Sequence, residues 1–87
     1  MSGENESLLT FPTDLAVKVF GRNDSDFREA VRAIVEAQFG NAYSIAEQPS
    51  KQASYVSLTI TVHVESRARA NELYRALVAH ELVLMAL

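Results

Sequence analysis

Few residues in this chain are of a type and spacing that could do chemistry. The best candidate is the loop Gly21-Arg22-Asn23, because a short loop with an arginine before a helix can hold a phosphate. Hydrolysis of an acyl phosphate would also need an asparagine on a neighbouring strand to orient water. The strand that follows offers only Ser57, Thr59, Thr61 and His63. Asp24 and Asp26 follow the loop, where their carboxylates repel a phosphate, so we predict no catalytic residue and no enzyme activity.

Metal binding is not expected either. The chain has no cysteine, and its two histidines, His63 and His80, lie in different predicted elements. His80 has a simpler role, because a cationic ring near the end of a helix is favourable. We predict no metal site and no cofactor.

Arg67 and Arg69 lie in the first turn of a predicted helix, where positive charge opposes the helix dipole. One interpretation is a site for an anionic ligand or partner beside Ser66. The other is ordinary ion pairing, of Arg69 with Glu72 and of Arg67 with Glu65. The second interpretation is favoured.

The net charge of −3 and the pI near 5.2 argue against nucleic acid as a partner. Phe20 and Tyr55 could stack on bases, but both lie near strand ends and their neighbours are Ser and Thr. No apolar run is long enough to cross a bilayer, and the first residues are acidic where a signal peptide needs Lys or Arg. We therefore expect a cytoplasmic protein without a membrane partner.

Ser54–Val64 is the segment that organises the fold. Its alternation of apolar and polar residues predicts a long strand with one face in a core. Weaker strands are predicted at Asp14–Phe20 and Asn41–Glu47, the latter at an edge. Helical periodicity predicts one helix from Asp26 to a stop at Gly40, and a second from the cap Ser66 to about His80.

A last strand, Glu81–Leu87, completes the order βαββαβ. Two helices on one face of a four-stranded antiparallel sheet form a ferredoxin-like α+β fold, predicted for residues 8–87 after a disordered tail, residues 1–7. The last strand is apolar on both faces, with Val83, Met85 and Leu87 on one of them. An apolar edge strand is normally covered or paired. Leu8, Leu9 and Phe11 cover the open face of the sheet, or another chain pairs with the edge, or both arrangements hold together.

Several segments resemble the YbeD-like family of small bacterial proteins. They are Leu8–Thr13, Lys18–Gly21, Pro49-Ser50-Lys51 with Tyr55 and Ser57–Thr61, Leu73–Leu77 and Val83–Leu87. The resemblance covers the chain from Leu8 and implies a ferredoxin-like fold related to the ACT regulatory domains. It also implies a link with lipoate attachment or synthesis, and it supplies no catalytic residues.

The sequence thus predicts a small non-enzymatic regulatory or adaptor domain. Its partner is another protein or a second copy of itself, and the alternative is an ACT-like domain that binds a small-molecule effector as a dimer. The candidate binding residues lie on the open sheet face and in the first loop: Lys18, Phe20, Gly21, Arg22, Asn23, Tyr55, Ser57, Thr59 and Thr61. A ligand module should have a pocket beside the loop Gly21–Ser25, whereas a protein-docking module should expose apolar residues of the last strand.

Overall fold

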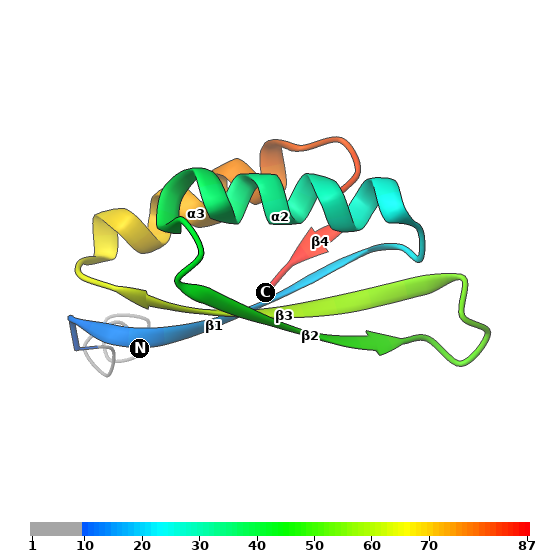
Figure 1. The fold of residues 1–87 in the computed structure, drawn as a ribbon, viewed down its shortest axis with the longest axis horizontal. Helices are drawn as coiled ribbons and strands as arrows, with labels where there is room; N and C mark the ends of the chain where they lie inside the picture. The colour runs from blue at the N-terminus through cyan, green and yellow to red at the C-terminus, as the bar shows by residue number, and fades with distance from the viewer. Residues whose placement is uncertain (1–9) are drawn as a thin grey trace, which may run out of the picture.

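The computed structural model describes residues 10–87 as a four-stranded antiparallel sheet with two helices on one side (Figure 1). The elements along the chain are β1 (Thr13–Arg22), α2 (Ser25–Phe39), β2 (Tyr43–Pro49), β3 (Tyr55–Val64), α3 (Arg67–Ala79) and β4 (Met85–Ala86). The strands lie in the order β2-β3-β1-β4. The predicted ferredoxin-like arrangement is therefore confirmed, with β3 in the interior of the sheet and β2 and β4 at its edges.

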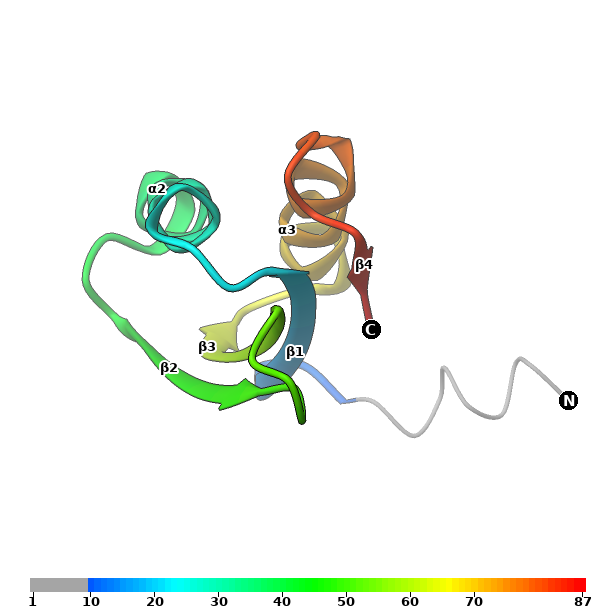
Figure 2. The same cartoon turned by 90° about the vertical axis from the view of Figure 1, so that its right-hand side faces the viewer.

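The alternation along β3 divides the sheet into two faces. Its five aliphatic side chains, Val56, Leu58, Ile60, Val62 and Val64, are at most 2% exposed. They pack with Val17 and Val19 of β1 against the buried faces of α2 and α3. Both helices lie on this side, as the end-on view shows (Figure 2), and no helix of residues 10–87 covers the other side of the sheet. We call this second side the open face.

Each helix begins at a side-chain cap. The Asp24 carboxylate accepts a hydrogen bond of 2.9 Å from the Phe27 amide at the start of α2. The Ser66 hydroxyl accepts one of 3.3 Å from the Arg69 amide at the start of α3. Such caps satisfy amide groups that have no partner within the helix. Gly40 ends α2 with φ of 63°, a conformation that favours glycine.

The first strand is longer than predicted. Gly21 and Arg22 are not part of a turn but pair with Val56 and Tyr55 of β3. The predicted loop Gly21–Ser25 is thereby reduced to Asn23 and Asp24, since α2 begins at Ser25. The physical reason is the contact of Gly21 with Phe27: a Cβ atom at Gly21 would lie under 3.0 Å from the Phe27 ring. Because Gly21 has no side chain, the Phe27 ring can lie directly against the backbone of β1 while Gly21 stays paired with Val56.

The predicted last strand, Glu81–Leu87, is wrong in length. Residues 80–82 form a turn in which the His80 Nδ1 accepts a hydrogen bond of 3.1 Å from the Leu82 amide. The His80 ring thus helps to hold this turn. Pairing with β1 starts where the Leu84 amide donates to the Phe20 carbonyl, at 2.9 Å. It ends where Leu87 and Lys18 exchange two backbone hydrogen bonds, of 2.8 and 3.0 Å.

The predicted faces of this segment also need correction. Met85 pairs with Phe20, and Leu87 pairs with Lys18, so both side chains belong to the open face. Val83 was predicted to share that face, but it packs against the hydrophobic core. The turn before it breaks the period of two, because alternation requires a continuous extended backbone.

The N-terminal part of the chain differs from the prediction as well. Phe11 packs against the core, and the guanidinium carbon of Arg67 lies 5.4 Å from its ring centroid. Because Arg67 begins α3, this contact places Phe11 on the helix side and not over the open face. Leu8 and Leu9 lie outside the described residues.

Candidate functional site

Strand register gathers most of the predicted binding residues into rows on the open face. One row runs across all four strands as Gln48, Ser57, Phe20 and Met85. The next row contains Ala46, Thr59, Lys18 and Leu87. Arg22 and Tyr55 face each other at the end of the sheet. Thr61 lies one row beyond Thr59, opposite Ala16.

The apolar members of these rows form one surface, the apolar patch, which consists of Phe20, Tyr55, Met85 and Leu87. Phe20 is half-buried, while Tyr55, Met85 and Leu87 are 45%, 53% and 61% exposed. Large apolar side chains that adjoin one another on an open surface are typical of interaction sites. Met85 and Leu87 belong to the last strand, and their exposure is the feature expected of a protein-docking module.

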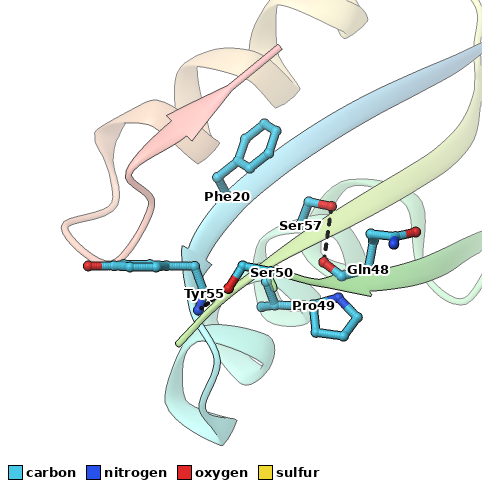
Figure 3. Close-up of a pocket in the computed structure, with 7 residues that line it drawn as sticks. Phe20, Gln48, Pro49, Ser50, Tyr55 and Ser57 are labelled. Atoms are coloured by element: carbon cyan, nitrogen blue, oxygen red, sulfur yellow. Dashed lines mark hydrogen bonds between the residues drawn. The ribbon is translucent and has the colours of Figure 1, made fainter. Parts of the chain in front are cut away.

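A shallow pocket of about 200 Å³ opens within one end of the apolar patch. Figure 3 shows Phe20, Tyr55 and Ser57 around it, with Pro49 and Ser50 from the end of β2 and its turn. The Ser50 hydroxyl accepts from the Tyr55 amide at 3.2 Å, and the Ser57 hydroxyl donates to the Gln48 carbonyl at 3.4 Å. These bonds hold the β2–β3 turn against the pocket.

Gln48, Pro49 and Ser50 were not among the predicted site residues. Their place follows from antiparallel pairing between β2 and β3, which puts Gln48 opposite Ser57. The sequence did signal a turn at Pro49, but the predicted strand ended at Glu47. Extending the pairing by two rows would have found Gln48 and Pro49, and Ser50 follows them directly.

Hydrogen bonds within the fold occupy the polar groups of Asn23 in the predicted loop Gly21–Ser25. The Asn23 amide group donates to the Ala53 carbonyl at 3.0 Å, and its oxygen accepts from Arg28 at 2.6 Å. The Arg22 guanidinium carbon lies 5.8 Å from the Tyr55 ring centroid. Because Asp24 already occupies the start of α2, the loop presents a carboxylate where a phosphate cradle needs free amides.

Arg28 and Glu47 form an ion pair that no pattern in the sequence indicates. Arg28 Nε and Nη2 donate to the two carboxylate oxygens of Glu47 at 2.8 and 2.9 Å. The hydrogen bonds to Arg28 hold the pKa of the Glu47 carboxyl below its usual value of 4.5. The pair joins α2 to the edge strand β2, and its two residues are 19 positions apart in the sequence.

The other end of the open face is polar. His63 Nδ1 lies 2.9 Å from the Asp14 carboxylate, and its Nε2 lies 3.5 Å from Glu65. The His63 side chain is 56% exposed. Within residues 10–87, no three His, Asp or Glu side chains gather in a way that could hold a metal ion.

Arg69 at the start of α3 makes the ordinary contacts that were favoured for it. Its Nε lies 3.4 Å from Glu72, as predicted for an i, i+3 pair. Its Nη2 also donates to the Gln38 carbonyl at 2.7 Å, which ties α3 to the end of α2.

Neither helix of the described chain combines the length and hydropathy that a bilayer crossing requires.

Comparison with known proteins gives a family and a fold. The sequence matches the profile of a protein family of unknown function, DUF493, over residues 6–87. It is 38% identical over 86 residues to a UPF0250 protein of Paraburkholderia phytofirmans, which covers 95% of this chain and 96% of the relative. A UPF0250 protein of Neisseria gonorrhoeae is 37% identical over 79 residues, covering 88% and 87%. These matches confirm the resemblance to the YbeD-like proteins.

The fold is similar to the solution structure of protein HP0495 from H. pylori. The TM-score is 0.77, and the match covers 91% of this chain and 85% of that chain. With 16% sequence identity, the likeness concerns the fold alone.

Proposed function

Because this chain belongs to the DUF493 family of bacterial proteins, whose function is unknown, we propose its role from its own surface. The proposed role is that of a small non-enzymatic regulatory or adaptor domain, which docks another protein on its open face. The observation that carries the proposal is the apolar patch. Tyr55, Met85 and Leu87 adjoin Phe20 across three strands and are 45–61% exposed. Burial of such side chains against a partner is favourable by roughly 25 cal/mol per Å² of apolar area.

The absence of an enzyme role is part of the proposal. It is supported by the state of the loop between β1 and α2, where Asn23 and Asp24 are engaged in hydrogen bonds within the fold. Among the described residues of the open face, the ring nitrogens of His63 lie against the Asp14 and Glu65 carboxylates and not against a serine or threonine hydroxyl. A docking role requires no activated nucleophile.

The proposed pathway depends on the family resemblance. That resemblance links the YbeD-like proteins with lipoate attachment or synthesis, so enzymes of that pathway are the first partners to test. The proposal includes a cytoplasmic location, which fractionation of cells that produce a tagged chain would check.

Site-specific photocrosslinking in a bacterium that encodes the protein tests the docking role. A photoreactive phenylalanine analogue at Met85 should yield a defined crosslinked protein. The same analogue at Val78, which is 59% exposed on α3, is the matched control and should yield none. Crosslinks that are identical from both positions, or that arise from Val78 alone, would contradict docking on the open face.

A second candidate function is supported by the pocket of about 200 Å³ at Phe20, Pro49 and Tyr55. It is an ACT-like effector domain that binds a small molecule as a dimer. The pocket lies at the β2–β3 turn and not at the loop Gly21–Ser25, where a ligand module was expected to have it. Ultracentrifugation distinguishes the two roles, since the effector domain must dimerise on ligand binding and the docking domain need not.

A further inference from the structure

The side-chain charges on the open face are separated along the sheet. Asp14 and His63 form a contact of 2.9 Å at one end, where β1 begins. Lys18 and Arg22 lie at the other end, on either side of Phe20 along β1. Both cations are exposed, and neither forms an ion pair with another residue of the described chain, 10–87. The apolar patch is therefore flanked by positive charge, although the whole chain carries −3.

The described part of the N-terminal segment does not cover this patch. The described chain enters β1 at the end far from the patch (Figure 1). Phe20 lies about 23 Å along the strand from Thr13, at roughly 3.3 Å per residue. Phe11, the large apolar residue of this segment that the structure describes, packs against the core and not on the patch.

A second copy is a poor occupant for electrostatic reasons. In a two-fold dimer the same surface of both copies meets itself. If the two-fold axis passed through the patch, Lys18 and Arg22 of one copy would lie near the same cations of the other. Like charges in a desolvated interface cost free energy, so the patch favours a partner of opposite sign.

The edge of the sheet beside the patch can accept an extended chain. Leu87 exchanges both backbone hydrogen bonds with Lys18. In an antiparallel ladder the residue next to such a pair turns its N–H and C=O away from the partner strand. That residue is Ala86, and no strand of the described chain lies beyond β4. A segment that pairs with Ala86 would project alternate side chains over the open face.

From these observations we infer that the partner presents an extended segment that combines acidic and apolar residues. The segment adds to the outer edge of β4. Its apolar side chains contact Phe20, Met85 and Leu87, and its carboxylates pair with Lys18 and Arg22. This inference rests on the proposed docking function and specifies its chemistry.

Selection from a random twelve-residue peptide library displayed on phage tests the inference, with the full-length protein as target. Selected peptides should be enriched in Asp and Glu next to Leu, Ile or Phe. The variant Lys18→Glu/Arg22→Glu should bind them at least about tenfold more weakly, and should itself select peptides rich in Lys and Arg. Arg75→Glu, an exposed charge reversal on α3, is the matched control and should leave binding within about twofold.

Amide hydrogen exchange measured by NMR tests the position of the peptide. The Ala86 amide should exchange more slowly when a selected peptide is bound, and Met85→Ser should abolish the binding. Unchanged exchange at Ala86 would overturn the addition to β4. Folding of each variant is checked from its own NMR spectrum.

The outcomes separate the inference from the function on which it rests. Peptides that are neutral or basic, yet lose binding in Met85→Ser, overturn the acidic partner and leave docking on the open face intact. A selection without any peptide that depends on Met85 overturns both.

Discussion

Substitution of Gly21 by alanine should destabilise the protein through a single contact. Gly21 is buried in β1, and a Cβ atom there would lie under 3.0 Å from three atoms of the Phe27 ring. Phe27 is 1% exposed and belongs to the core, so its ring has no free space to enter. Gly21 does not have a positive φ, so a change of backbone conformation is not needed and the effect is steric.

The magnitude follows from known costs of overpacking. Extra methylene groups in a packed core cost about 1–3 kcal/mol. For a domain of this size each kcal/mol lowers Tm by roughly 4–8 °C. We therefore expect Gly21→Ala to lower Tm by about 4–24 °C, measured by circular dichroism, with the loss of free energy measured by urea unfolding.

A double-mutant cycle with Phe27→Leu identifies the cause. The smaller side chain makes room for the methyl group, so Gly21→Ala should cost less in the Phe27→Leu background than in the wild type. Gly40→Ala is the control: nothing lies within 4 Å of its added Cβ, and its cost of about 1–2 kcal/mol comes from φ of 63° alone. That cost should be independent of Phe27. Equal costs of Gly21→Ala in both backgrounds would refute the steric explanation.

Three further substitutions test other parts of the fold. Asp24→Ala should lower the free energy of unfolding by about 0.5–2 kcal/mol through loss of the cap on α2, whereas Asp24→Asn should retain most of it in urea titrations. Ile60→Ala should cost about 2–5 kcal/mol because Ile60 is 0% exposed, while Thr61→Ala on the open face should stay within about 0.5 kcal/mol in the same assay. The pKa of Glu47 is lowered in the folded protein, so its contribution to stability is present above pH 4.5 and is lost as the pH falls below that value. Glu47→Gln should therefore flatten the fall of Tm below pH 4.5. An unchanged profile of Tm against pH would contradict the pairing with Arg28.

The candidate site could be predicted only in part. Parity along β1 and β3 placed Lys18, Phe20, Tyr55, Ser57, Thr59 and Thr61 on the open face, because side chains alternate strictly along a strand. The same reasoning failed for Val83, since a turn at residues 80–82 resets the alternation before β4. Gly21 and Asn23 were predicted as binding residues of a loop, but Gly21 lies in β1 against Phe27, and Asn23 bonds to Ala53 and Arg28.

By itself the sequence determined the elements and their order. The period of two in residues 54–64, the helical periodicity of one segment before it and one after it, and the cap Ser66 are local patterns that act over a few residues. Only the tertiary structure decided which of these residues share a surface. The row Gln48, Ser57, Phe20 and Met85 and the Arg28–Glu47 pair depend on register between distant strands and on the approach of a helix to an edge strand. Such contacts are made across the fold and leave no periodic signal along the chain.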